Sequence, residues 1–71
     1  MEDIEIAESV MESLLDENSE GISKEDFYEK MRGYSIPPSR RKELWGIILD
    51  NYIEVGEIEI GPGGYRRKTE E

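Results

Sequence analysis

The chain has 71 residues and a formal net charge of −9, from 18 acidic and 9 basic residues. This length makes one domain with a small hydrophobic core. Cysteine and histidine are both absent, which excludes disulfide bonds, thiolate metal sites and the commonest general base of enzymes. We therefore expect a non-enzymatic protein with no metal and no cofactor.

The acidic residues are concentrated at the start of the chain. Residues 1–23 contain eight acidic residues and no basic one, for a net charge of −8, whereas residues 24–71 contain ten acidic and nine basic residues, for a net charge of −1. The sequence begins with acidic Glu2 and Asp3, unlike a signal or transit peptide. No apolar run approaches membrane-spanning length. We expect a cytoplasmic protein without a membrane segment.

An amphipathic helix is predicted over about residues 3–17, with Asp3 as its N-cap. Its apolar residues recur every three or four positions, at Ile4, Ala7, Met11 and Leu14. The acidic residues fall mainly on the opposite face. That face either keeps the protein in solution or docks a basic partner, and nothing local separates the two interpretations.

A second helix is predicted over about residues 24–32. Ser23 and Asp26 have the spacing of a capping box, and Ile22 and Phe27 have the spacing of a hydrophobic staple. A second interpretation places Ile22 in an extended segment, where it adds a short third strand to the hairpin described below.

The third predicted helix covers about residues 39–52. Gly33 is predicted to end the second helix in the left-handed conformation. Pro37 and Pro38 then prevent a helix from continuing but are compatible with starting one, and we expect Ser39 to be the N-cap. Five residues share the buried face of this helix: Leu44, Trp45, Ile48, Leu49 and Tyr52. Four others share the exposed face: Glu43, Gly46, Ile47 and Asp50.

A β-hairpin is predicted over about residues 57–60 and 65–68. Residues 57–60 alternate between acidic and apolar side chains, which is the period of a strand with one solvated face. The Gly-Pro-Gly-Gly sequence of residues 61–64 is predicted to form the turn. The tail, residues 69–71, is expected to be frayed.

This order of elements resembles the winged helix-turn-helix family. The matching stretches are Gly21–Lys24 at the start of the second helix, Pro37–Arg41 at the start of the third, and the hairpin Glu57–Arg67 around its glycine-rich tip. The resemblance covers Ile4 to Lys68 and rests on order and spacing. It implies an α+β, mainly α fold: a small winged helix with three helices followed by a C-terminal β-hairpin wing, in one domain over residues 1–71.

The resemblance also implies that the ligand is double-stranded DNA and that the protein regulates transcription. In that family the third helix lies in the major groove and the wing contacts the backbone or the minor groove. Six residues of this chain would contact the phosphates: Ser39, Arg40 and Lys42 on the third helix, and Arg66, Arg67 and Lys68 on the wing. Arg41 points toward the apolar side of its helix and is expected to brace the fold. A homodimer on two half-sites is one arrangement that suits a chain this small.

These cations could equally pair with carboxylates of the same chain. Three basic residues in the first turn of a helix oppose its dipole, so they serve either a phosphate backbone or the acidic face of the first helix. Strand alternation places Arg66 and Arg67 on opposite faces of the hairpin, where the alternative is pairing across the strands with Glu57 and Glu59.

The exposed face of the third helix also favours a different ligand. Glu43 and Asp50 would be repelled by phosphates, and Ile47 between them is typical of a protein contact. The alternative function is therefore a protein-interaction module for a partner with a basic surface, or an acidic mimic of nucleic acid. The candidate partner-binding residues are Glu5, Glu8, Glu12 and Ile47.

Overall fold

The computed structural model of the chain describes residues 2–68. Its elements are α1 (Asp3–Glu17), α2 (Lys24–Met31), the 3-10 helix η1 (Arg32–Tyr34), α3 (Pro38–Glu54), β1 (Ile58–Gly61) and β2 (Gly64–Arg67). Three helices followed by a two-stranded antiparallel hairpin make a small, mainly helical α+β fold, which confirms the predicted fold class. The tail predicted to be frayed, residues 69–71, lies outside the described residues.

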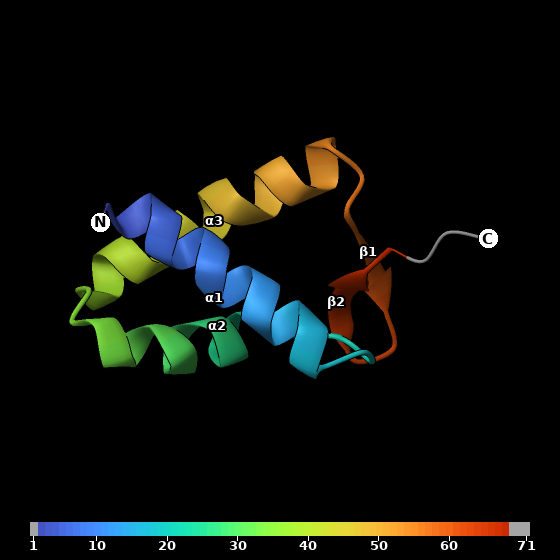
Figure 1. The fold of residues 1–71 in the computed structure, drawn as a ribbon, viewed down its shortest axis with the longest axis horizontal. Helices are drawn as coiled ribbons and strands as arrows, with labels where there is room; N and C mark the ends of the chain where they lie inside the picture. Colours follow the sequence, from blue (N-terminus) through green and yellow to red (C-terminus); the bar gives the residue numbers. More distant parts are fainter. Residues whose placement is uncertain (1, 69–71) are drawn as a thin grey trace.

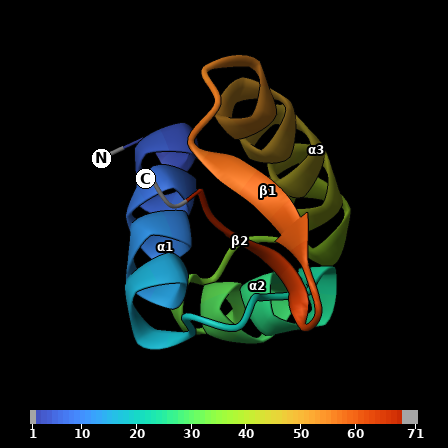
Figure 2. The ribbon, with the colours of Figure 1, turned by 90° about the vertical axis from the view of Figure 1, so that its right-hand side faces the viewer.

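The three helices surround the core and the hairpin closes one end of the molecule (Figures 1 and 2). Figure 2 shows α1 and α3 on opposite sides, α2 beneath them and the hairpin across the front. The N-terminal end of α3 lies at the end of the molecule opposite the hairpin (Figure 1). Within residues 2–68, none of the helices combines the length and apolarity needed to cross a membrane.

Aromatic side chains connect the helices to the hairpin. The ring centroid of Trp45 lies 5.2 Å from that of Phe27 on α2 and 6.0 Å from that of Tyr65 on β2, distances at which aromatic pairs stabilise a core beyond the area they bury. Four of the five residues predicted to face inward from α3 are buried, and Leu49 is half-buried. The predicted buried face of this helix is therefore confirmed.

The predicted N-cap of α1 is wrong by one residue, and that of α3 is wrong by two. Glu2 occupies the N-cap position of α1, and Asp3 is the first residue of the helix. Pro37 occupies the N-cap position of α3, which places Pro38 first and Ser39 second in the helix. Proline suits the first helical position because its fixed φ matches the helix and its missing N–H would have no partner there. The helix also runs to Glu54, two residues beyond its predicted end.

The beginning of α2 is as predicted, but its end is not. Ser23 and Asp26 form the predicted capping box, in which the Ser23 N–H donates to Asp26 Oδ2 at 2.9 Å. Gly33 does not end the helix in the left-handed conformation. The chain continues through η1, and the left-handed residue is Ser35, with φ of 59°. The 3-10 helix extends α2 by one more turn of the same hand. The chain therefore changes direction at Ser35, just before the buried Ile36.

The hairpin turn is tighter than predicted. Gly61 pairs with Gly64, so the loop has only the two residues Pro62 and Gly63, a common length for a hairpin connection. The strands are therefore residues 58–61 and 64–67 in place of 57–60 and 65–68. Lys68 lies just past β2, although its N–H donates to the Glu57 carbonyl at 2.8 Å.

Ile22 pairs with β2 through an isolated β-bridge, so the contact expected from its second interpretation is present, but the predicted third strand is not: the sheet has two strands within residues 2–68. Its N–H donates to the Tyr65 carbonyl at 2.7 Å, and the Tyr65 N–H donates to the Ile22 carbonyl at 2.9 Å. The two backbones approach so closely that a Cβ on Gly64 would lie 2.3 Å from the Ile22 oxygen, and the φ of Gly64 is +123°. A side chain at this position is therefore both strained and blocked.

We expect opposite effects from alanine at two glycines. Gly64→Ala should lower the free energy of unfolding by roughly 1–3 kcal/mol, because its left-handed backbone is strained for alanine and its Cβ meets the Ile22 carbonyl. Gly46→Ala should raise it by about 0.5–1 kcal/mol, because Gly46 lies inside α3 with open space around it. Urea unfolding of the two variants and the parent measures both changes in the free energy of unfolding. A neutral Gly64→Ala variant would contradict the close contact between Ile22 and β2.

Candidate functional site

Arg40, predicted to contact phosphate, is bound to the start of α1. Its Nε donates to Asp3 Oδ2 at 2.7 Å and its Nη2 donates to Asp3 Oδ1 at 3.2 Å, and Glu43 lies 3.8 Å away. Two parallel hydrogen bonds are the strongest arrangement between guanidinium and carboxylate. They hold the pKa of Asp3 below its usual value and raise the pKa of Arg40. This cation therefore serves the first helix, which is one of the two roles that the sequence left open.

The other residues at the start of α3 differ in their surroundings. The Nε of Arg41 donates to the Ile36 carbonyl at 2.7 Å, so Arg41 braces the connector before α3, consistent with its predicted role. Ser39 and Lys42 are both exposed at the surface. Lys42 has no ion pair within residues 2–68.

Arg66 on the wing pairs with the residue directly opposite it in the hairpin. Glu59 faces Arg66 in the strand register, and its Oε2 accepts from Arg66 Nε at 2.8 Å and lies 2.7 Å from Nη2. Pairs of opposite charge across two strands stabilise a hairpin. For Arg66 the structure therefore shows the pairing that the sequence left open as an alternative to phosphate binding.

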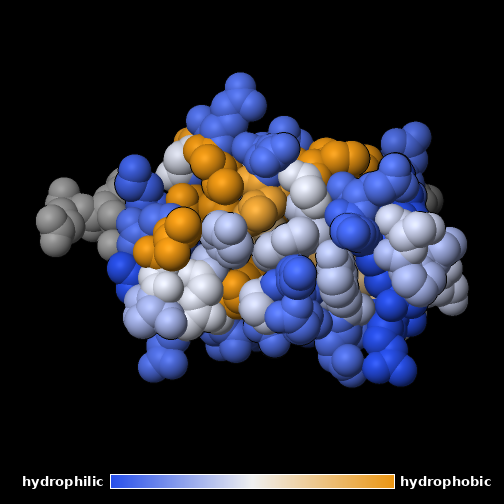
Figure 3. Space-filling model, turned by 180° about the vertical axis from the view of Figure 1, so that it is seen from behind, coloured by the Kyte–Doolittle hydropathy of each residue, from blue (hydrophilic) through white to orange (hydrophobic). Residues whose placement is uncertain are grey.

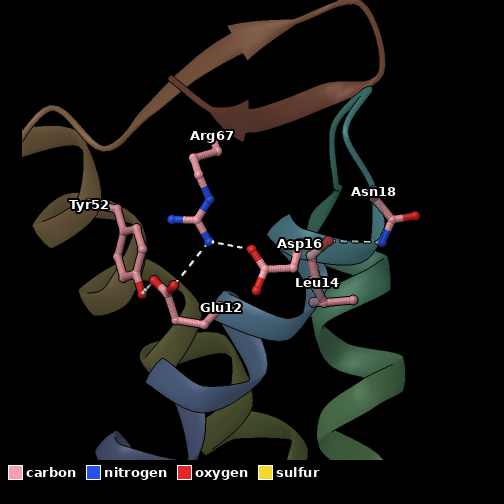
Figure 4. A network of polar contacts seen from close by, with 6 residues as sticks. All are labelled: Glu12, Leu14, Asp16, Asn18, Tyr52 and Arg67. Carbon is pink, nitrogen blue, oxygen red and sulfur yellow. Dashed lines mark hydrogen bonds and ion pairs between the residues drawn. The ribbon is translucent and has the colours of Figure 1, made fainter. Parts of the chain in front are cut away.

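Arg67 joins the hairpin to α1 in a polar network (Figure 4). Its Nη2 donates to Glu12 Oε1 at 3.0 Å and to Asp16 Oδ1 at 2.9 Å. The Tyr52 hydroxyl on α3 donates to the other oxygen of Glu12. Both oxygens of this one carboxylate are thus used, and they connect α1, α3 and β2.

The network changes the ionisation of its members. The hydrogen bond from Tyr52, and then the contact with Arg67, hold the pKa of Glu12 below its ordinary value of 4.5. Burial, together with the hydrogen bond to Glu12, raises the pKa of Tyr52 well above 10. Hydrogen bonding to Glu12 raises the pKa of Arg67. At neutral pH the network therefore holds an ionised carboxylate, a neutral phenol and a cation.

The two basic groups predicted to share one DNA-binding face lie apart. Arg40 is held at the beginning of α1 by Asp3, and Arg67 is held near its end by Asp16. The rise of an α-helix places those two anchors about 20 Å from each other. Figure 1 shows the same separation, with the start of α3 and the hairpin at opposite ends of the long axis.

The predicted partner-binding acids line a groove between α1 and the end of α3. A shallow hollow of about 600 Å³ is lined by Glu5, Glu8, Ser9, Glu12, Ser13 and Tyr52. A second hollow of about 300 Å³ shares three of these residues and is lined by Glu8, Glu12, Asn51, Tyr52, Val55 and Glu57. We call the two together the acidic groove. No lysine or arginine is among its lining residues.

Ile47 does not line the acidic groove. It lies on the outward side of α3, and 42% of it is exposed. Three further apolar residues are exposed at the end of α3 and on the hairpin: Ile53, Val55 and Ile60. Figure 3 shows apolar side chains gathered over this part of the molecule. Ile60 and Ile58 alternate onto the same face of β1, but Ile58 is buried whereas 80% of Ile60 is exposed.

Sequence reasoning missed the roles of Tyr52 and Asp16. Tyr52 was predicted only as a core residue, and Asp16 only as part of an acidic face. Tyr52 is 40 positions from Glu12 and Asp16 is 51 positions from Arg67, so no local pattern connects them. Among the described residues, no group of three or more Asp and Glu side chains is arranged to hold a metal ion.

Comparison with protein-family models, curated proteins and solved structures finds no match to this chain.

Replacing Glu12 tests the network through its pH dependence. Glu12→Gln should lower the free energy of unfolding at pH 7 by about 1 kcal/mol, a modest value for a charged hydrogen bond because the Glu12 side chain is 47% exposed. The pKa of Glu12 is depressed in the folded state, so its contribution is present above pH 4.5 and is lost as the pH falls further. The difference in the free energy of unfolding between parent and variant, measured by urea unfolding, should therefore shrink as the pH falls below 4.5.

Glu20→Gln is the control for this experiment, because Glu20 is an exposed acid outside the helices with no ion pair within residues 2–68. It should change the free energy of unfolding little at any of these pH values. A deficit for Glu12→Gln that stays constant as the pH falls well below 4.5 would show that Glu12 does not stabilise the fold as an ionised carboxylate.

Alkaline unfolding tests Tyr52. Its pKa is raised in the folded state above the ordinary value of 10.0, so above that pH the unfolded chain loses this proton first. Stability contributed by neutral Tyr52 is therefore present below pH 10 and is lost as the pH rises. The difference in stability between parent and Tyr52→Phe should shrink above pH 10. The control Tyr34→Phe, at a residue that is 49% exposed, should show no such change.

Proposed function

We propose that this chain is a non-enzymatic protein-interaction module that binds a basic segment of a partner protein in the acidic groove. The division of charges supports this most directly. Arg40, Arg66 and Arg67 are held by the chain's own carboxylates, whereas Glu5 and Glu8 line a groove that has no cation among its lining residues.

The charge around α1 suits a cationic ligand. Residues 1–23 carry a net charge of −8, and the three cations that pair with α1 neutralise only part of it, so a negative field remains around this helix. Such a field attracts basic ligands and raises their rate of association, and added salt screens it. Tyr52 and the exposed Val55 add apolar surface to the groove. A segment that carries both basic and apolar side chains therefore fits it best.

Double-stranded DNA, the ligand that the winged-helix resemblance implies, fits less well. A phosphate would have to replace Asp3 at Arg40 and Glu59 at Arg66, and the two cations lie toward opposite ends of the molecule. Lys42 and the exposed Lys68 remain candidates for a weak, salt-sensitive contact. An acidic mimic of nucleic acid would use the same groove, because its partner would also be basic.

A short peptide of alternating arginine and alanine is a suitable probe of the groove. We expect it to bind the parent chain at low salt and more weakly at about 150 mM salt, because screening shortens the range of the attraction. Glu5→Gln with Glu8→Gln should weaken binding roughly three- to tenfold, since each exposed pair contributes a few tenths to one kcal/mol. Calorimetric titration gives the affinities, and amide NMR shifts locate the site.

The matched control is Glu20→Gln with Glu25→Gln, which removes the same charge from two exposed residues outside the groove. This control should weaken peptide binding by less than about twofold. A parallel titration uses duplex DNA. Tight, salt-sensitive binding of the duplex that Arg40→Glu and Lys42→Glu abolish, with no peptide shifts in α1, would overturn the proposed function in favour of DNA binding.

A further inference from the structure

The residue at the centre of the acidic groove is already bound to a cation of the same chain. Glu12 lines both hollows of the groove, yet its Oε1 accepts from Arg67 and its Oε2 accepts from Tyr52. Figure 4 shows the Arg67 guanidinium reaching down from the hairpin to this carboxylate. A partner's basic side chain therefore meets an occupied carboxylate at Glu12.

We infer that Arg67 is an internal competitor for the acidic groove: the basic side chain of a partner displaces Arg67 from Glu12, leaves Asp16 as its one remaining partner on α1 among the described residues, and so weakens the hold of α1 on the C-terminal end of β2. The inference rests on the proposed function and adds how that site is regulated. Arg67 has the chemistry expected of the ligand, and it contacts Glu12 through a single nitrogen, Nη2.

The contact is accessible enough to be exchanged. The side chains of Arg67 and Glu12 are 40% and 47% exposed, and that of Asp16 is 71% exposed. An ion pair this open to solvent is weak because water and salt screen it. An incoming guanidinium replaces one cation with another at Glu12, so no buried charge is left unpaired.

The release is confined to one end of the hairpin. At the other end, Tyr65 keeps its two backbone hydrogen bonds to Ile22 and its contact with Trp45, and none of these involves Arg67. By linkage, the coupling is reciprocal: a ligand that frees Arg67 loosens this end of β2, and any change that frees Arg67 strengthens ligand binding.

Arg67→Gln tests the competition with the arginine–alanine peptide. It should tighten peptide binding roughly three- to tenfold, because it removes the competing cation. Arg66→Gln is the matched control. It makes the same change of charge at the next residue, its side chain is 35% exposed against 40% for Arg67, and it contacts Glu59 instead of the groove. It should tighten binding less than about twofold. Equal effects of the two variants would show that only net charge matters and would overturn the inference.

A measurement on the parent chain decides the question if Arg67→Gln fails to fold. In the free chain Arg67 Nη2 donates to Glu12 Oε1, so the side-chain N–H signals of Arg67 in NMR spectra should shift when the arginine–alanine peptide binds. The signals of Arg66, which donates to Glu59 outside the groove, are the control and should not shift. Unchanged Arg67 signals in a chain that binds the peptide would overturn the inference while leaving the proposed function intact. Absence of peptide binding by the parent and every variant would overturn both.

Discussion

The carboxylate of Glu12 is the polar interaction through which α1 meets both the end of α3 and the hairpin. It accepts hydrogen bonds from Tyr52 in the last turn of α3 and from Arg67 on β2, so one residue of α1 connects these two elements. A chain of this size has a small core and no disulfide bond to support it. Polar contacts between elements therefore contribute a larger share of what fixes the hairpin against the helices.

The acidic residues of α1 also account for the position of three of the nine basic residues. The first helix contains several acidic residues and no basic one, and the rest of the chain supplies cations along its length: Arg40 at Asp3, Arg67 at Glu12 and Asp16, and Lys30 at Glu17. These pairs reduce repulsion among the acids of α1 and hold other elements against it.

Three helices followed by a hairpin are compatible with many functions, so function has to be argued from these side chains and not from the fold.

Under the proposed function, the acidic groove would combine stability and recognition in one set of residues. Hydrogen bonds from Tyr52 and Arg67 hold the pKa of Glu12 below its ordinary value, and Glu12 also lines the groove proposed to bind a basic ligand. A ligand that competes for Glu12 therefore acts on the position of the hairpin. The exposed Ile53, Val55 and Ile60 lie near that end of the molecule, and apolar surface of this kind is characteristic of protein contacts.

The sequence by itself determined the order of the main helices and strands, the capping box of α2 and the buried face of α3. Each of these follows from spacing within a few residues or from the position of glycine and proline. The contact of Ile22 with the hairpin was one of two interpretations that the sequence left open, and the tertiary structure decided it. The bounds of the hairpin and the N-caps of α1 and α3 were missed by a residue or two, because several neighbouring residues suit each position. Only the tertiary structure decided which carboxylate each arginine meets. Arg40 and Asp3 are 37 positions apart and Arg67 and Glu12 are 55 apart, and no local pattern carries information over such distances.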